Sequence, residues 1–190
     1  SLARLWNENP DTIKRTSHAL AVLALDVDLF ERAVLALAAL AAHGPAPKAN
    51  IRDSHPLQVL EEIFDFHYPK TNAPIDDRVT ALRQMAERYP SISWTLILSL
   101  LTRRMTVLLN LPQPSVLRLT VPPRDRLTYS GEAYGQVQVF LHLAMELAAK
   151  DSVRWAELVR HLDVRAIPTE LVLEALEHLA AIADGLHDEQ

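Results

Sequence analysis

The chain has 190 residues, a length typical of one domain, with 49% hydrophobic residues, 23% charged residues and a formal net charge of −5. The absence of Cys excludes disulfides, thiolate-bound zinc, iron–sulfur clusters and cysteine nucleophiles, and it favours a reducing compartment, so we expect a cytoplasmic protein. The net negative charge disfavours nucleic-acid binding by the surface as a whole.

Leucine and alanine supply most of the hydrophobic residues, whereas the chain has only 4 Gly. Leu and Ala are the strongest apolar helix formers, and Gly is the residue that hairpins need, so the composition predicts an all-α fold. The longest apolar run, 29–42, contains Glu31 and Arg32 and is too short to span a bilayer. The chain starts with Ser, and Leu2–Trp6 reads as an amphipathic helix, so we expect a segment of a larger protein.

The first predicted helix pair lies within residues 9–42. Asn9-Pro10-Asp11 provides a cap, a first-turn proline and an acidic group, which together start a helix that runs to about Leu25. Asp26-Val27-Asp28 then forms a turn and a new cap. The following helix, Leu29–Ala42, is apolar nearly all round and should be covered on several sides. The inward positions expected on the first helix are Ile13, Leu20, Leu23 and Ala24.

Two proline-marked starts predict the next helices. Ser54-His55-Pro56 begins a short helix that ends near His67, and Pro74 begins a helix that runs through Arg88. A turn at Tyr89-Pro90-Ser91 leads into Ile92–Arg103, which is again almost wholly apolar. The expected buried positions are Leu57, Leu60, Ile63 and Phe64 on the short helix, and Ile75, Val79, Leu82, Met85 and Ala86 on the next.

The helix pairs recur along the chain. Ala19–Leu40 can be laid over Ala81–Leu101 at an offset of 62, and a looser copy follows in three helices, Val137–Ala149, Ser152–His161 and Pro168–Ala183. The last helix carries a stripe of Leu171, Leu173, Leu176, Leu179 and Ile182. We therefore predict a single domain, 1–190, of antiparallel helix pairs stacked as a short right-handed α-solenoid, with sub-units 1–43, 54–103 and 131–190. The alternative is a chance match between Leu/Ala-rich helices.

An irregular connection is expected at about 104–130, since Asn110–Gly131 contains four prolines. Residues 103–126 hold five Arg and one Asp, a formal charge of +4, so the rest of the chain carries −9. Guanidinium groups bind carboxylates and phosphates in forked geometry, and nearby tyrosines could add stacking. The candidate partner-binding residues are Arg103, Arg104, Arg118, Arg124, Arg126, Tyr129 and Tyr134. The alternative is that these arginines pair with the acidic helices around them.

No residue pattern predicts catalysis. His142 with Glu146, and Glu174 with His178, share helix faces, but two ligands do not make a metal site and no HExxH is present. The carboxylate groups Asp26, Asp28 and Glu31, and Glu61, Glu62 and Asp65, suit helix starts and solvated faces. Neither a Gly-x-Ser-x-Gly elbow nor a phosphate loop can be formed. We expect no enzyme activity, cofactor or metal, with Trp94 and Trp155 in the core and Trp6 exposed.

Three stretches carry a family resemblance: Asn9-Pro10-Asp11 before Ala19–Leu25, Ala81–Leu101 with its Tyr89-Pro90 turn, and Leu147–Leu158 joined to Pro168–Leu179. Together they resemble the tetratricopeptide- or HEAT-like arrays that follow the NTPase or effector domain in large bacterial STAND-type signalling and defence proteins. The resemblance implies a sensor or scaffold arm that binds a protein ligand or packs against its own NTPase core.

The expected function is therefore protein–protein interaction without catalysis. A first alternative is a nucleic-acid-binding regulatory domain that uses the arginine-rich connection. It predicts binding that weakens with salt and is lost in the Arg124→Ala, Arg126→Ala double variant. A second alternative is a helical metal or small-molecule enzyme in which His142, Glu146 and a further ligand converge.

Overall fold

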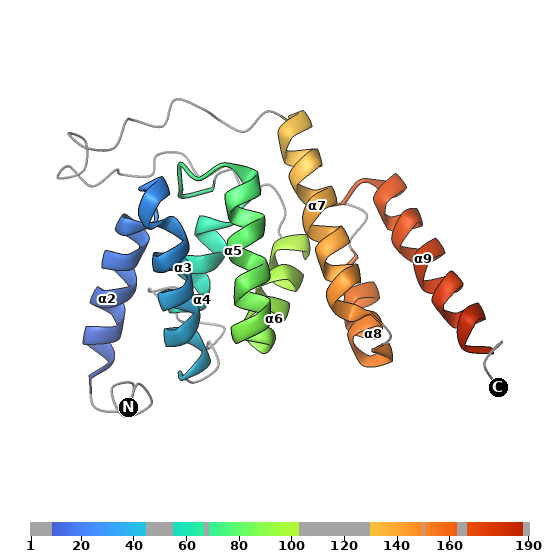
Figure 1. The fold of residues 1–190 in the computed structure, drawn as a ribbon, viewed down its shortest axis with the longest axis horizontal. Coiled ribbons are helices and arrows are strands. Elements are labelled where there is room, and N and C mark those ends of the chain that lie inside the picture. Colours follow the sequence, from blue (N-terminus) through green and yellow to red (C-terminus); the bar gives the residue numbers. More distant parts are fainter. Residues whose placement is uncertain are drawn as a thin grey trace.

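The computed structural model describes residues 9–44, 55–66, 69–102, 130–149, 151–162 and 167–187. Within these ranges the chain forms α-helices and no β-strand, which confirms the all-α prediction (Figure 1). None of these helices is both long and apolar enough to cross a membrane. The helices are α2 (Pro10–Leu23), α3 (Val27–Ala42), α4 (Pro56–Ile63), α5 (Ile75–Arg88), α6 (Pro90–Thr102), α7 (Ser130–Ala148), α8 (Ser152–His161) and α9 (Thr169–His187).

Local capping explains where several helices begin. Asn9 Oδ1 accepts a hydrogen bond from the Thr12 amide at 3.1 Å, as expected for the residue before Pro10. Asp26 Oδ1 accepts from the Asp28 amide at 2.9 Å, which confirms the new cap predicted between the first two helices. At α4 the cap is the His55 ring, whose Nδ1 accepts from the Leu57 amide at 3.2 Å. Side chains just outside each helix therefore bind its otherwise unpaired amides.

Several predicted helix ends were wrong by a few residues. Helix α3 begins at Val27 rather than Leu29, and α4 ends at Ile63 rather than near His67. The early end of α4 coincides with a backbone hydrogen bond from the Lys70 amide to the Glu62 carbonyl at 2.9 Å, which turns the chain back. Helix α7 starts at Ser130, so the predicted irregular stretch ends one residue earlier than expected. The rest of that stretch, 104–129, lies outside the described residues.

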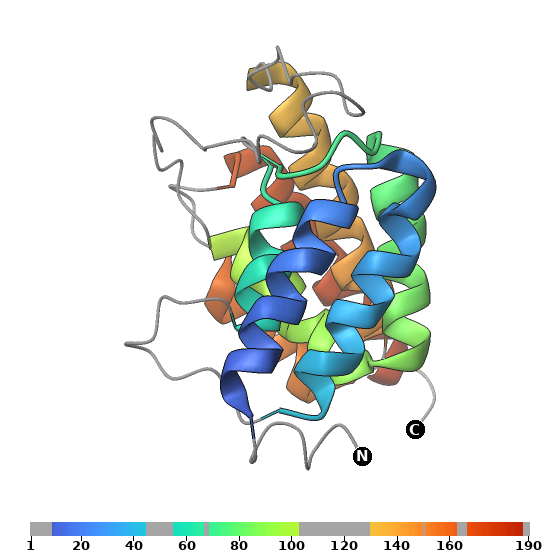
Figure 2. The same cartoon turned by 90° about the vertical axis from the view of Figure 1, so that its left-hand side faces the viewer.

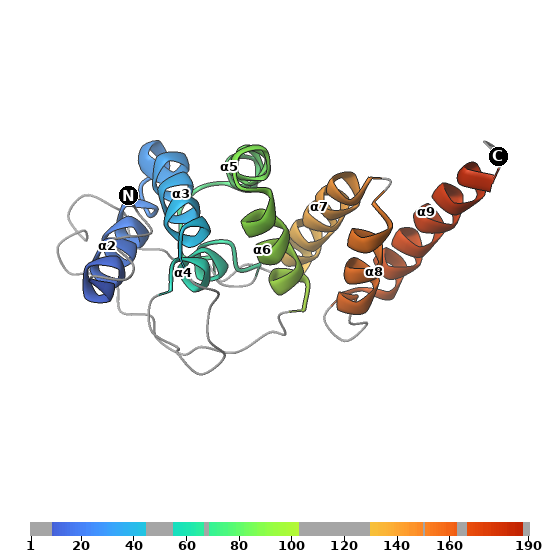
Figure 3. The same ribbon diagram turned by 90° about the horizontal axis from the view of Figure 1, so that it is seen from below.

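The helices pack in two rows. The first row contains α3, α5, α7 and α9, and the second contains α2, α4, α6 and α8; within each row successive helices contact one another. The α2–α3, α3–α4, α5–α6, α6–α7 and α7–α8 contacts join the rows (Figures 1 and 3). Seen from the α2 end, α2 and α3 stand in front and the later helices follow behind them (Figure 2). The order of the helices along each row therefore follows their order along the chain.

The offset of 62 in the sequence matches helices that occupy different positions in the packing. That offset pairs α2 with α5 and α3 with α6, but α2 and α5 stand in different rows, as do α3 and α6. By position in the rows, α3 corresponds to α5 and α4 to α6. Because α4 stands between the two pairs along the chain and successive helices alternate between the rows, α5 lies in the row of α3 and not in that of α2.

One hydrophobic core runs through all the described helices. Its centre holds four phenylalanine rings from α3, the end of α4 and α7: the Phe64 ring lies 6.0 Å from Phe30 and 6.2 Å from Phe140, and Phe66 lies 5.2 Å from Phe140. The two pairs that include Phe140 are edge to face, an arrangement that stabilises beyond the area it buries. The predicted stripe of α4 is entirely buried, as are Trp94 and Trp155. Trp6 lies outside the described residues.

Some residues predicted to face the core are exposed instead. Leu23 is 43% exposed at the end of α2, and Leu173 and Leu176 on α9 are 53% and 41% exposed. The side of α9 that is buried carries Leu171, Val172 and Ala175. Helix α9 is thus rotated relative to the predicted stripe, because its extensive packing partner is α7.

The connection between α4 and α5 is fixed to the end of α2. Thr71 is fully buried, and its Oγ1 donates to the Ala24 carbonyl at 2.6 Å, while Asn72 Nδ2 donates to the Leu25 carbonyl at 3.0 Å. These bonds occupy carbonyls that the end of α2 leaves unpaired. They attach the α4–α5 connection to the turn between α2 and α3.

Candidate functional site

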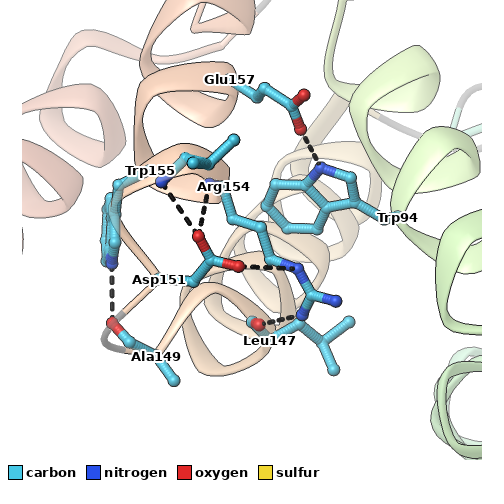
Figure 4. A network of polar contacts seen from close by, with 8 residues as sticks. Trp94, Leu147, Ala149, Asp151, Arg154, Trp155 and Glu157 are labelled. Carbon is cyan, nitrogen blue, oxygen red and sulfur yellow. Dashed lines mark hydrogen bonds and ion pairs between the residues drawn. The ribbon is translucent and has the colours of Figure 1, made fainter.

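A polar network joins α8 to α6 and α7 (Figure 4). The Trp94 indole Nε1 of α6 donates to Glu157 Oε2 of α8 at 2.6 Å, and the Arg154 guanidinium lies over the Trp94 ring, 5.5 Å from its centroid. Arg154 Nη1 also donates to the Leu147 carbonyl at the end of α7, at 2.6 Å. Because the donor and acceptor groups come from three helices, this network sets the position of α8 relative to its neighbours.

Hydrogen bonds fix both ends of the turn between α7 and α8. Asp151 caps α8, accepting from the Val153 amide at 2.9 Å and the Arg154 amide at 3.2 Å. Ala149 has a positive φ of 44°, a conformation that favours glycine, and its carbonyl accepts from Trp155 Nε1 at 2.8 Å (Figure 4). Trp155 is 2% exposed and so fixes the turn against the core.

Helix α9 is attached chiefly through α7. His142 Nε2 of α7 lies 2.7 Å from Glu174 Oε1 of α9, and the His178 ring lies 5.9 Å from the Trp155 ring of α8. Both members of the His142–Glu174 pair are over one third exposed, so the pair adds little to stability. Packing of Leu171, Val172 and Ala175 supplies most of the attachment.

The outward sides of α8 and α9 expose apolar side chains. Helix α9 presents a stripe of Leu173, Leu176 and Ala180, with spacings of three and four residues, and we call this stripe the α9 outer face. Helix α8 also exposes Val153 and Val159, at 66% and 37%. An amphipathic helix normally turns such a stripe towards a partner. Among the described residues, four of the seven exposed large hydrophobic side chains lie on α8 and α9, which makes this end the candidate surface.

The residues predicted to bind a partner cannot be placed at this surface. Six of them lie outside the described residues: Arg103, Arg104, Arg118, Arg124, Arg126 and Tyr129. Tyr134 lies in α7, and its side chain is also outside the described part. The surface on α9 was missed because its leucines were expected to be buried. The sequence signal was present, since α9 has more apolar positions than one buried face can hold.

The two residues considered from the sequence as metal ligands, His142 and Glu146, bind different side chains. Glu146 is bound by Arg83 of α5, with Arg83 Nη1 2.6 Å and Nη2 3.2 Å from its two carboxylate oxygens, while His142 meets Glu174. Hydrogen bonding from Arg83 lowers the pKa of Glu146. Among the described residues, no three His, Asp or Glu side chains are close enough to share a metal ion.

Two other carboxylates considered for catalysis bind side chains outside their own helix. Ser99 Oγ of α6 donates to Glu61 Oε1 of α4 at 2.7 Å, and Glu62 forms an ion pair with Lys70. A shallow depression on α2 is lined by exposed side chains only, those of Asp11, Lys14, Arg15 and His18. Water surrounds such groups, so their charges are screened.

In its described residues the protein is all-helical, and apolar side chains are exposed on α8 and α9 at one end. Comparison with protein-family models, with curated proteins and with solved structures finds no match for the chain.

Proposed function

We propose that the chain is a short α-solenoid that serves as a non-catalytic scaffold or sensor module and binds another protein through its α8–α9 end. The observation that carries this proposal is the exposed α9 outer face, where Leu173 is 53% and Leu176 is 41% exposed on a helix whose other side is packed on α7. Burying large aliphatic side chains against a partner is the commonest source of binding free energy between proteins.

The two-row packing supports the solenoid part of the proposal. In a solenoid each helix pair buries the face of the pair before it, so an end pair retains an unburied face. Helices α5 and α7 each have neighbours on both sides within their row, whereas α9 has α7 on one side and exposed leucines on the other. The resemblance to arrays of large bacterial signalling or defence proteins gives the context in which we expect such a module to act.

The proposal is tested by cross-linking the chain to proteins of its own source organism and then measuring the affinity of each purified candidate by calorimetry. The test variant is Leu173→Glu, and the matched control is Val27→Glu, which places the same charge at another exposed aliphatic residue. We expect Leu173→Glu to weaken binding at least about tenfold, the effect of losing a central interface residue, and Val27→Glu to leave it unchanged. Equal affinities of the two variants would show that the α8–α9 end is not the binding surface.

A further inference from the structure

The charges beside the α9 outer face indicate what kind of partner it fits. Glu170 and Glu177 lie one turn before and one turn after Leu173, so both carboxylates border the apolar stripe on the same side. Both side chains are exposed. Helix α9 has four acidic residues and neither Lys nor Arg. The face is therefore an apolar ridge with a negative edge.

We infer that the partner at this face is an amphipathic helix with an apolar ridge that covers Leu173, Leu176 and Ala180 and with Lys or Arg along the edge that meets Glu170 and Glu177. This inference rests on the proposed function and specifies the partner's chemistry. A helix suits the face because the exposed stripe is straight and has helical spacing, and ridges of one helix pack into the grooves of another. Basic residues suit it because complementary charges at an interface's edge steer association and reject other partners.

A second copy of the chain fits the face less well. Two antiparallel α9 helices packed across a twofold axis perpendicular to them would set the Glu170 and Glu177 edges of the two chains near each other, and like charges brought together oppose binding. Each chain also carries a net charge of −5, which adds repulsion at longer range. The acidic edge thus selects against self-association while it attracts a basic helix.

Two synthetic peptide probes test the inference with the whole chain. Both are amphipathic helices with the same Leu/Ala ridge, one flanked by Lys and the other by Glu, and binding is measured by fluorescence anisotropy. We expect the lysine-flanked peptide to bind about tenfold more tightly than the glutamate-flanked peptide, with the difference shrinking as salt is added. Leu173→Glu should weaken the lysine-flanked peptide at least about tenfold.

A charge-matched pair of variants separates the acidic edge from the overall negative charge. Glu170→Gln with Glu177→Gln should reduce the preference for the lysine-flanked peptide several-fold. Glu31→Gln with Glu87→Gln, which removes two other exposed carboxylates, from α3 and α5, should leave the preference unchanged. If both double variants lower the preference equally, the attraction comes from net charge and the inference is wrong.

The remaining outcomes are also decisive. Equal binding of the two peptides, with loss on Leu173→Glu, would overturn the basic partner but keep the proposed binding surface. Failure of both peptides to bind would overturn the inference, while the proposed function would still be judged separately by Leu173→Glu against the natural partner. A dimer detected by sedimentation and abolished by Leu173→Glu would assign the face to a second copy instead.

Discussion

The contact between Trp94 and Glu157 should make a measurable contribution to holding α8 against α6. Replacing Trp94 with Phe removes the indole N–H but keeps an aromatic ring near Arg154, and replacing Glu157 with Ala removes the acceptor. Each single change also alters packing and solvation. A double-mutant cycle, in which both changes are made separately and together, isolates the free energy of the contact itself.

The size of the coupling follows from the geometry. The donor–acceptor distance is 2.6 Å and the acceptor is a carboxylate, and hydrogen bonds to charged groups contribute about 1.5–3 kcal/mol. Trp94 is nearly buried, whereas Glu157 retains partial access to water, which screens its charge. The lower end of the range applies, so we expect a coupling of about 1.5 kcal/mol.

Equilibrium unfolding in urea, followed by far-ultraviolet circular dichroism, measures this coupling without depending on tryptophan fluorescence. The free energies of unfolding of the four proteins give the coupling by difference. The control cycle combines Trp94→Phe with Glu177→Ala, a carboxylate on α9, and should give additive effects. A Trp94–Glu157 coupling within about 0.5 kcal/mol of zero, the scatter expected of independent sites, would refute the contact.

Three further predictions concern the core, the α7–α8 turn and one ion pair. Phe140→Ala should destabilise the protein by about 3–5 kcal/mol, because it removes a fully buried ring that contacts two others. Ala149→Gly should stabilise it by up to about 1 kcal/mol, because Ala149 is exposed and has a positive φ of 44°. Arg83 lowers the pKa of Glu146, so their ion pair stabilises the fold fully above the ordinary pKa of that carboxyl. This stabilisation is lost as the pH falls through the lowered pKa. Arg83→Ala should remove that pH dependence of the unfolding free energy, which is under about 0.5 kcal/mol for a half-exposed pair.

Urea unfolding checks all three. Phe140→Leu serves as the control for the core and should cost far less than Phe140→Ala, since most of the volume remains. Ala180→Gly, within the helical part of α9, should destabilise by about 1 kcal/mol, opposite in sign to Ala149→Gly. For the ion pair, Glu146→Gln should flatten the pH profile as Arg83→Ala does. The same sign for the two glycine variants, or an unchanged pH profile in either ion-pair variant, would contradict the corresponding prediction.

The helices could be predicted from the sequence because their signals are local. Asn9 and Asp26 stand directly before runs with helical periodicity, and both cap as expected. The orientation of α9 could not be predicted in the same way. Its apolar positions form two overlapping stripes, one with Leu171 and Ala175 and one with Leu173 and Leu176, and only contact with α7 decides which is buried.

The polar network at the α6–α8 joint has no local signal at all. Trp94 and Glu157 are 63 residues apart, and Glu157 reads in the sequence as an ordinary charged residue on a helix surface. The prediction that Trp94 fills the core was confirmed, but its hydrogen-bonding partner depends on the relative placement of two helices. The same reason explains why Arg83 could not be matched with Glu146 from spacing alone.

The agreement between chain order and spatial order bears on how the protein folds. The extensive contacts join helices no more than three apart along the described chain, as α3 and α6 are. Low contact order of this kind is associated with fast folding, because little loop entropy is lost before contacts form. During synthesis on the ribosome, each new helix would meet neighbours that have already emerged, and assembly could advance from the amino end without waiting for the last residues.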